Sequence, residues 1–277
     1  MGSFSPRNTV LIDYVLQAAQ EKRAPILVQI SSNELRWFSL SAKEFADQFY
    51  ECRKKYDVPA ILHLDHTYDP QVVFEAIEAG FQSVMIDASK LDFEENIRMT
   101  KEVAVYAHQH DVAVEAELGN IGGADKLETG GDEELYTVPE QVVEFVARSE
   151  CDTLAVSIGT AHGVYPVKDP KIDFERLKKI RALTDTPLVL HGGSGLPGAT
   201  VRRAIQLDGM GGIAKINIAT DLELVFQKEM GVGRMSNAEV KKLNPKMLER
   251  AGEAVKALCE DRICNYLFSA GKADAVF

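Results

Sequence analysis

Three histidines of this 277-residue sequence are placed where they could bind one metal ion. His66, His162 and His191 each follow a short apolar run, and each run is predicted to form a different β-strand. In a parallel barrel the carboxyl ends of the strands lie on one face, so the three imidazoles would converge there. Three histidines with a fourth position open are the usual ligands of a catalytic zinc ion. The spacing therefore predicts a Zn²⁺ site.

Acidic residues adjoin these predicted ligands. Asp65 precedes His66 and could be a fourth ligand, a structural partner, or a general acid or base. Glu115 and Glu117 have the same phase on one predicted strand, so at least one should face the barrel interior. Two carboxylates there would repel each other unless a cation lay near them. The zinc ion would supply that cation.

The remaining histidines are expected to have other roles. His63 shares the inward phase of Asp65 and is predicted to lie in the core. His108 and His110 fall at the end of a predicted helix, where a positive charge suits the helix dipole. We expect both of them on the surface.

Two loops are candidates for phosphate binding. The turn Gly192-Gly193-Ser194-Gly195 follows the seventh predicted strand, and Asn217–Thr220 follows the eighth at the start of a predicted helix. Loops after strands seven and eight of a (β/α)8 barrel commonly bind phosphate through backbone N–H groups and a helix N-terminus. The position of the two loops therefore predicts a phosphate site.

Alternating strands and helices are predicted to position these residues. The strands are predicted at Gly2–Ser5, Ile26–Ser31, Ala60–Leu64, Ser83–Asp87, Ala113–Leu118, Thr153–Ile158, Leu188–Leu190 and Ile213–Ile218. Amphipathic helices are predicted at Val10–Glu21, Ala42–Lys55, Asn96–His108, Pro139–Arg148 and Phe174–Leu183. Two further helices should follow about Glu223. The pattern predicts an α/β fold, a (β/α)8 TIM barrel with extra C-terminal helices, in a single domain over residues 1–277.

Composition argues against several classes of protein. The formal net charge is −11, and no basic cluster offsets it, so nucleic-acid binding is not expected. No apolar run approaches the roughly 20 residues needed to span a bilayer. The first residues do not resemble a signal peptide. The four cysteines form no Cys-x-x-Cys pair and are expected to be reduced. Together these features predict a cytoplasmic protein.

Five ordered motifs resemble the class II ketose-bisphosphate aldolases, which include the fructose-bisphosphate and tagatose-bisphosphate enzymes. The motifs are HLDH at 63–66, VEAELG at 114–119, GTAHG at 159–163, LHGGSG at 190–195 and KINIAT at 215–220. The resemblance runs from about Ile26 to Asp221. It implies that His66, His162 and His191 bind zinc, that Glu117 can approach the metal, and that Asp65 exchanges a proton with the substrate's C4 hydroxyl.

The resemblance also implies the substrate, the reaction and the assembly. Substrate would contact Ser31, Gly163, Gly192, Gly193, Ser194, Asn217, Ile218, Ala219 and Thr220. The expected reaction is zinc-dependent, reversible cleavage of fructose or tagatose 1,6-bisphosphate to dihydroxyacetone phosphate and glyceraldehyde 3-phosphate, in carbohydrate metabolism such as glycolysis. A monovalent cation, Na⁺ or K⁺, would lie beside the phosphate. A homodimer or homotetramer is expected.

Three features depart from the family pattern. The sequence begins at the first strand, where family members have a longer segment, so we expect a less well plugged barrel bottom. Ser5 stands where the family has an asparagine near the substrate. In the predicted lid, Gly119–Thr137, Asp125 falls at the position of the family's catalytic glutamate. Glu128 is a nearby substitute for it.

Other functions would use the same barrel. Lys215 shares the inward phase of Asn217 and could form a Schiff base in a metal-free aldolase. A metal-dependent hydrolase would need a His-x-His pair on the first strand, whereas this sequence has one at His108–His110. The chain could also act on another ketose or deoxy-sugar phosphate, or be a non-catalytic partner of an active aldolase.

Overall fold

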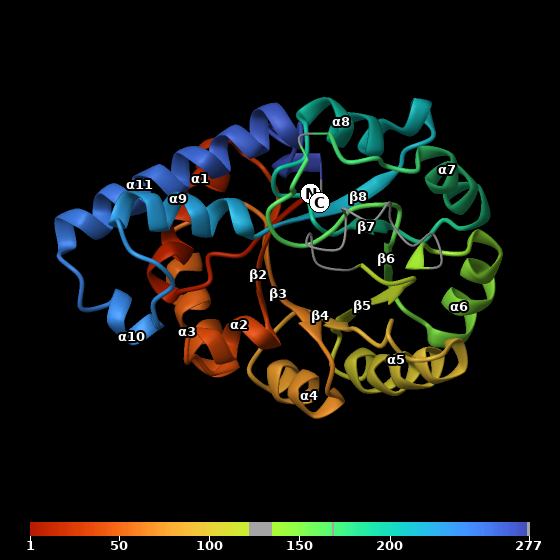
Figure 1. Ribbon diagram of the computed structural model, residues 1–277. Coiled ribbons are helices and arrows are strands. Elements are labelled where there is room, and N and C mark those ends of the chain that lie inside the picture. Colours follow the sequence, from red (N-terminus) through yellow and green to blue (C-terminus); the bar gives the residue numbers. More distant parts are fainter. Residues whose placement is uncertain (122–134, 168, 276–277) are drawn as a thin grey trace.

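Eight parallel strands close into a barrel in the order β1 to β8 (Figure 1). The computed structural model describes residues 1–121, 135–167 and 169–275. The strands are β1 (Gly2–Phe4), β2 (Ile26–Ser31), β3 (Ala60–Thr67), β4 (Ser83–Ile86), β5 (Ala113–Leu118), β6 (Thr153–Val156), β7 (Leu188–Leu190) and β8 (Ile213–Ile218). The predicted (β/α)8 fold is confirmed. β1 pairs with both β2 and β8, which closes the barrel.

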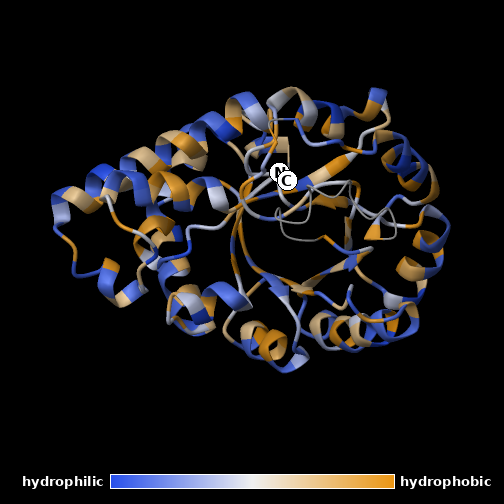
Figure 2. Cartoon of the chain, in the orientation of Figure 1, coloured by the Kyte–Doolittle hydropathy of each residue, from blue (hydrophilic) through white to orange (hydrophobic). Residues whose placement is uncertain are grey.

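Helices surround the strands. They are α1 (Ile12–Glu21), α2 (Ser32–Trp37), α3 (Ala42–Arg53), α4 (Pro70–Glu78), α5 (Phe93–His108), α6 (Val142–Ser149), α7 (Phe174–Leu183), α8 (Gly198–Gln206), α9 (Thr220–Met230), α10 (Asn237–Val240) and α11 (Pro245–Asp261). Shorter helical turns are η1 (Thr9–Leu11), η4 (Pro139–Gln141), η5 (Leu207–Gly209), η6 (Arg262–Tyr266) and η7 (Ala273–Ala275). Figure 2 shows hydrophobic residues concentrated on the strands and hydrophilic residues on the outer faces of the helices.

Alternate residues of a strand face either the hydrophobic core between strands and helices or the interior of the barrel. Along β3, Leu62 and Leu64 are fully buried in the main hydrophobic core, whereas His63 and Asp65 alternate with them. Met85, Ala155 and Val189 pack together as a separate small apolar cluster, and their register partners on neighbouring strands include Glu115, Glu117 and Lys215. The inward residues at the carboxyl ends are polar. The barrel interior thus combines a small apolar cluster with charged groups at neighbouring register positions.

Strand β3 is longer than predicted. It runs on to Thr67 because Ser31 of β2 still pairs with Asp65, and Ile86 of β4 pairs with Thr67. Asp65 and His66 therefore lie on the strand and not in the loop after it. Hydrophobicity alone missed this end because its residues are polar. Their positions are consequently set by the sheet's hydrogen bonds.

The C-terminal helices agree with the prediction. The helix after β8, α9, already begins at Thr220, and the short α10 precedes the long α11. Figure 1 shows α11 lying along α1 and α9. The extra C-terminal helices are present, but α9 belongs to the eighth β/α unit. Its first turn therefore lies at the mouth of the barrel.

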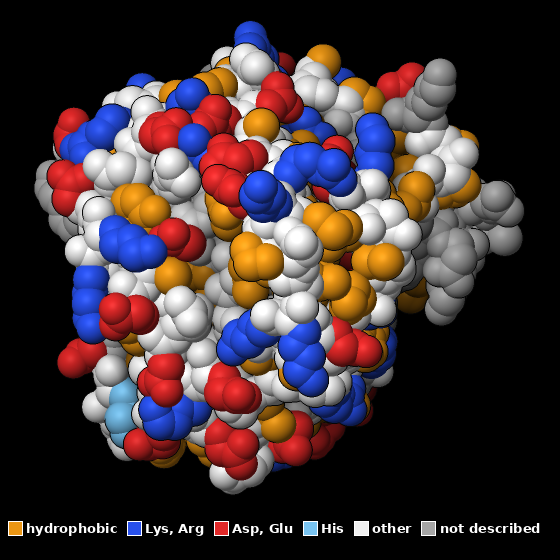
Figure 3. Space-filling view, turned by 90° about the vertical axis from the view of Figure 1, so that its left-hand side faces the viewer, with side chains coloured by type: hydrophobic (Ala, Val, Ile, Leu, Met, Phe, Trp, Pro, Cys, Tyr) orange, Lys and Arg blue, Asp and Glu red, His pale blue; other side chains and the backbone are white. Residues whose placement is uncertain are grey.

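The surface carries mixed charges, and the cysteines form no disulfide among the described residues. Figure 3 shows acidic and basic side chains interspersed on the face that carries α10 and α11. All four cysteines are free thiols, as predicted. No helix within the described residues is long and apolar enough to cross a membrane.

Candidate active site

The structure brings the three predicted zinc ligands together at the mouth of the barrel. The Nε2 atoms of His66 and His162 are 2.9 Å apart, and Nδ1 of His191 lies 2.6 Å from His66 Nε2. These nitrogens all lie within 4.8 Å of one another. His66 comes from β3, while His162 and His191 follow β6 and β7. Strands far apart in sequence thus supply one cluster of nitrogen donors.

Two carboxylates hold the outer nitrogens of these histidines. Asp87 Oδ2 lies 2.9 Å from His66 Nδ1, and Glu115 Oε1 lies 2.8 Å from His191 Nε2. Asp87 itself accepts hydrogen bonds from the amide and hydroxyl of Ser89. A carboxylate behind a metal-binding histidine fixes which ring nitrogen faces the site. This accounts for His191 presenting Nδ1 where His66 presents Nε2.

Glu115 is neutralised from the other side by a lysine. Lys215 Nζ donates to Glu115 Oε2 at 2.7 Å and lies 3.0 Å from Nε2 of His63. Burial and the charge of Lys215 lower the pKa of His63 to about 3, so this imidazole is neutral. His63, Glu115 and Lys215 are all buried, as predicted for His63. They form a closed set of contacts behind His191.

Glu117 faces the histidines and has an unused oxygen. Its Oε1 accepts the amide of Ile121 at 3.0 Å, whereas the buried Oε2 has no hydrogen-bond partner among the described residues. Oε2 lies 3.8 Å from His191 Nδ1. Burial and the neighbouring Asp87 raise the pKa of Glu117 to about 8. An unpaired buried carboxylate oxygen beside three imidazole nitrogens fits a divalent cation.

The raised pKa of His66 also indicates a site for a cation. Burial alone would lower its pKa, but the carboxylates of Asp65 and Asp87 outweigh burial and raise the pKa to about 10. The pKa of His162 is instead lowered to about 3, first by burial and then by the charge of His66. The cluster therefore holds one positive charge at neutral pH. A metal ion would replace that proton.

Asp65 is held in place by two amide side chains. Gln29 of β2 donates to its Oδ2 at 2.8 Å, and Asn217 of β8 donates to its Oδ1 at 2.9 Å. Burial opposes ionisation, but the nearby His66 and His191 lower the pKa of this carboxyl overall. Asp65 is thus an ionised carboxylate held in a fixed orientation, one residue from His66, the predicted metal ligand.

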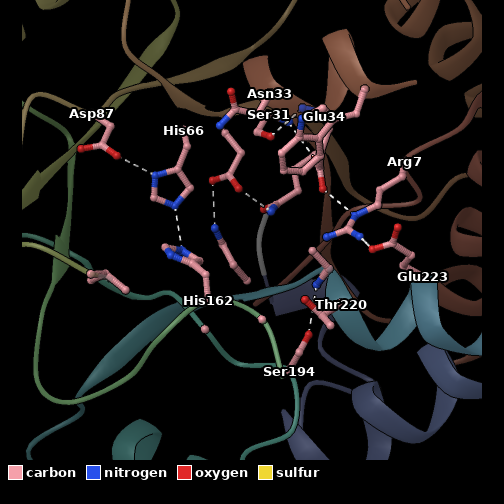
Figure 4. Close-up of a pocket in the computed structure, with 18 of the residues that line it drawn as sticks. Arg7, Ser31, Asn33, Glu34, His66, Asp87, His162, Ser194, Thr220 and Glu223 are labelled. Atoms are coloured by element: carbon pink, nitrogen blue, oxygen red, sulfur yellow. Dashed lines mark hydrogen bonds and ion pairs between the residues drawn. The ribbon is translucent and has the colours of Figure 1, made fainter. Parts of the chain in front are cut away.

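The predicted phosphate loops meet beside the histidines. Ser194 Oγ accepts the amides of Ala219 and Asp221, each at 3.2 Å, so it caps the first turn of α9. Gly192 has a positive φ of 66°, and a Cβ there would overlap the carbonyl of Ala161. The turn after β7 therefore packs directly on the segment that carries His162. Figure 4 shows Ser194 and Thr220 together on this side of the pocket.

One cavity of about 570 Å³ joins these groups. The predicted residues that line it are Ser31, Asp65, His66, His162, Gly163, Gly192, Ser194, Asn217, Ala219 and Thr220. Glu117, His191 and Gly193 are buried behind this surface. The side chain of Ile218 lies in the hydrophobic core, so only its main chain can serve the site. Asp125 and Glu128, the predicted lid acids, fall outside the described residues.

The far wall of the cavity was not predicted. Arg7 lies between Glu34 and Glu223, with its Nε 2.7 Å from Glu34 Oε1 and a second ion pair to Glu223 (Figure 4). Arg234 pairs with Glu223 at 2.8 Å. Ser5 is buried behind this wall, where its hydroxyl donates to Glu34 Oε2 at 2.9 Å.

One sequence signal for this wall was available. Ser31 and Glu34 form a capping box, a pattern that marks the start of a helix, so α2 could have been placed directly after β2. No sequence pattern links Arg7 to Glu223, because their contact depends on the loop after β1. The roles of Asp87 and Glu115 behind the histidines were equally hidden, although both were recognised at strand ends.

A closed (β/α)8 barrel with three histidines and a buried carboxylate at its strand ends is the architecture of a metal-dependent barrel enzyme. The chain belongs to the class II fructose-bisphosphate aldolase family, whose model matches residues 1–272. Members of this family are metal-dependent lyases. The family resemblance inferred from the five motifs is confirmed. Membership disfavours the hydrolase and Schiff-base alternatives.

Solved structures show the same relationship. The chain is 35% identical to the YdjI aldolase of Escherichia coli K12, with a TM-score of 0.82 over 99% of this chain and 93% of that one. A putative fructose-1,6-bisphosphate aldolase from Coccidioides immitis is 27% identical, with a TM-score of 0.83 over 99% and 93% of the two chains. The fructose-bisphosphate aldolase of Campylobacter jejuni shares the fold at 24% identity, with a TM-score of 0.77 over 96% and 89%.

Proposed function

We propose that this chain catalyses the reversible aldol cleavage of a ketose that carries a phosphate at C1, giving dihydroxyacetone phosphate and an aldehyde. The 1,6-bisphosphates of fructose and tagatose are the substrates predicted from the sequence, and glyceraldehyde 3-phosphate would then be the aldehyde. The observation that carries the proposal is the ionised Asp65, fixed by Gln29 and Asn217 beside three convergent histidines.

Four residues would hold the metal. His66, His162 and His191 offer nitrogen, and Glu117 offers its unpaired Oε2. Zn²⁺ bound by these residues would act as a Lewis acid and stabilise negative charge on the substrate's carbonyl oxygen. Asp87 and Glu115 keep His66 and His191 turned toward the site. The predicted zinc fits this donor set.

Asp65 would begin the cleavage. Its carboxylate takes the proton of the C4 hydroxyl, the C4 oxygen forms the aldehyde carbonyl, and the C3–C4 bond breaks. The electron pair of that bond stays on C3 of the three-carbon fragment, and an acid then protonates C3. The sequence assigns that acid to Asp125, with Glu128 as the substitute. Because Gln29 and Asn217 orient both oxygens of Asp65, it needs little rearrangement to accept the proton.

The loops after β6, β7 and β8 would bind the C1 phosphate. Gly163, Ser194 and Thr220 line one side of the cavity at the N-terminus of α9, whose positive end favours an anion. A monovalent cation, Na⁺ or K⁺, would lie beside the phosphate. This anchor keeps the triose half in place while the aldehyde leaves.

We also propose where the chain acts and how it assembles. The chain would act in the cytoplasm as one domain over residues 1–277, in a homodimer or homotetramer, within sugar catabolism such as glycolysis. Light scattering coupled to size-exclusion chromatography would measure the assembly. A monomer at micromolar concentration would contradict the oligomer.

A cleavage assay tests the proposed function. Release of dihydroxyacetone phosphate should be measured over a panel of ketose phosphates, with native protein, after thorough chelation, and after zinc is restored. Activity should disappear on chelation and return with Zn²⁺. Activity that survives chelation and is lost to borohydride with substrate would instead assign Lys215 as a Schiff base. The ion pair that holds Lys215 to Glu115 argues against that outcome.

A further inference from the structure

We propose that the cluster of Arg7, Glu34, Glu223 and Arg234, called here the aldehyde wall, selects aldehydes that end in an uncharged hydroxyl over those that end in a phosphate. The preferred substrates would then be ketose 1-phosphates without a second phosphate. This inference rests on the proposed function and concerns only its aldehyde half.

The direction of Asp65 places the aldehyde half against this wall. Asp65 is held by β2 and β8, through Gln29 and Asn217, whereas His66 turns to Asp87 beyond β4. With the C1 phosphate at the loops after β6 to β8, the remaining carbons extend along β1 and β2. Figure 4 shows Arg7 and Asp87 at opposite sides of the pocket.

The wall begins directly beside Asp65. Ser31 is the neighbour of Asp65 in the register of β2 and β3, and its amide donates to Glu34 Oε2 at 3.0 Å. The same oxygen accepts the hydroxyl of Ser5. Glu34 Oε1 accepts Nε of Arg7 at 2.7 Å. An unbroken chain of contacts thus leads from the base to Arg7.

Both arginines of the wall are already neutralised. Arg7 lies between Glu34 and Glu223, and their side chains are 10%, 6% and 12% exposed, so these pairs are poorly screened by water. Arg234 forms a two-point contact with Glu223, at 2.8 and 3.2 Å. Two guanidinium groups therefore face two carboxylates, and the wall carries no net charge.

Among the described residues, a phosphate against this wall would lack a compensating charge. Its dianion would meet Glu34 and Glu223, whose repulsion offsets the attraction of the arginines. A hydroxyl has no such penalty, because the guanidinium N–H groups and the carboxylate oxygens can act as donors and acceptors to it. Ala219, which lines the cavity beside Asn217, adds no charge.

Lys90 is the alternative cation for a second phosphate. It lines the cavity, and its Nζ lies 5.1 Å from the ring centroid of Tyr68. However, Lys90 follows β4 and is close in sequence to Asp87, which lies across the pocket from Arg7 (Figure 4). Lys90 therefore serves as the control position.

Matched aldehydes test the inference. The zinc-loaded full chain is given dihydroxyacetone phosphate with glyceraldehyde or glyceraldehyde 3-phosphate, and with erythrose or erythrose 4-phosphate. We expect kcat/KM for the unphosphorylated member of each pair to be higher by at least about tenfold, since like-charge contacts act against the other member. A phosphorylated member that is equal or better would overturn the inference. So would a chain that condenses neither member.

A second measurement separates this inference from the proposed function. Deuterium exchange into dihydroxyacetone phosphate in D₂O, followed by NMR without any aldehyde, reports on the metal and triose half alone. If deuterium exchange occurs and phosphorylated aldehydes are preferred, only the proposed selectivity of the aldehyde wall is refuted. Absence of exchange contradicts the proposed function, and the inference that depends on it fails too.

Two variants locate the selectivity. Glu223→Gln removes one negative charge from the wall and should raise the relative kcat/KM of glyceraldehyde 3-phosphate by about tenfold. Lys90→Met should leave the ratio unchanged. If the ratio changes in Lys90→Met and not in Glu223→Gln, the second phosphate is recognised near Lys90, and the inference is overturned. Deuterium exchange and the unfolding midpoint check that each variant is folded, and the wild-type comparison stands without them.

Discussion

Asp65 differs from the other carboxylates of the site in the partners that hold it. Asp87 and Glu115 each accept a histidine N–H, and Glu117 retains a free oxygen, whereas Asp65 is bound by two neutral amides. Amides orient a carboxylate without taking its charge or donating an acidic proton. This is the arrangement expected of a group that accepts and returns a proton.

Asp65→Ala should keep the metal and lose turnover. Loss of a positioned general base lowers kcat by about 10²–10⁴-fold, while the three histidines keep their own supports. Metal content by mass spectrometry and kcat for cleavage are the measurements, with Asp65→Asn as the control that preserves volume. A variant that loses its zinc would recast Asp65 as a ligand or a structural residue.

Metal binding should depend on pH. In the metal-free protein the pKa of His66 is raised to about 10 and that of Glu117 to about 8, so both hold a proton at pH 7. Zn²⁺ must displace those protons, so its affinity should rise between pH 6 and 8, by about tenfold per unit for each proton released. Calorimetry in buffers of different ionisation enthalpy counts the protons. Glu117→Gln should release fewer, and affinity that is flat over this range would argue against the scheme.

Lys215 is predicted to act on the metal through Glu115. Lys215→Met leaves the Glu115 carboxylate without its ion pair, which disturbs the support of His191, and zinc affinity should fall by about 10–100-fold. Removing the charge as well, in Lys215→Met/Glu115→Gln, should recover part of the loss. Competition with a chelator measures the affinity. Unchanged zinc binding in the single variant would show that Glu115 holds His191 unaided.

At the scale of elements, the strands were easier to predict than the wall of the pocket. β2, β5, β7 and β8 have the predicted bounds because their apolar residues face the helices in unbroken runs or clear alternation. The hydrophobic pattern places the end of β3 at Leu64, because it cannot follow a strand whose last residues include the polar Asp65 and His66. Pairing with β2 and β4, which sequence patterns do not record, decides where it ends.

The residues of the site also differ in how far the sequence predicts them. The histidines were predictable because a parallel barrel sends all its strand ends to one face. The contact of Arg7 with Glu34 and Glu223 was not, since it depends on how the loop after β1 bends toward the first turns of α2 and α9. Ser5 illustrates the limit. The sequence shows that a serine stands where the family has an asparagine. Only the structure shows that the Ser5 hydroxyl donates a hydrogen bond to Glu34.

The turn after β7 gives a prediction about stability. Gly192 and Gly231 have nearly the same φ, 66° and 67°, yet only Gly192 is packed against backbone, at Ala161. Gly231→Ala should cost about 1–2 kcal/mol for the left-handed conformation. Gly192→Ala should add about 1–3 kcal/mol for overpacking. Urea unfolding compares the two, and equal losses would mean that the turn moves away freely.

At the scale of the whole molecule, the metal should connect distant parts of the barrel. His66, His162 and His191 come from β3 and the ends of β6 and β7, so one ion would bridge segments separated by more than a hundred residues. Free zinc at about 100 times its Kd should stabilise the fold by about 2.7 kcal/mol. Thermal unfolding in zinc and in chelator measures this. His162→Ala should abolish most of the difference, and identical melting curves for the wild type would contradict a structural contribution.

The location of Asp65 on a strand and of the aldehyde wall on loops and helices has a consequence for evolvability. Asp65, Gln29 and Asn217 belong to β3, β2 and β8, whose geometry is maintained by the barrel itself. Arg7 precedes η1, and Glu34 and Glu223 belong to the first turns of helices. If the proposed function holds, mutations in the aldehyde wall would change which aldehyde is accepted without disturbing proton transfer at Asp65. A laboratory library confined to positions 7, 34, 223 and 234 would explore new substrates on an intact reaction centre.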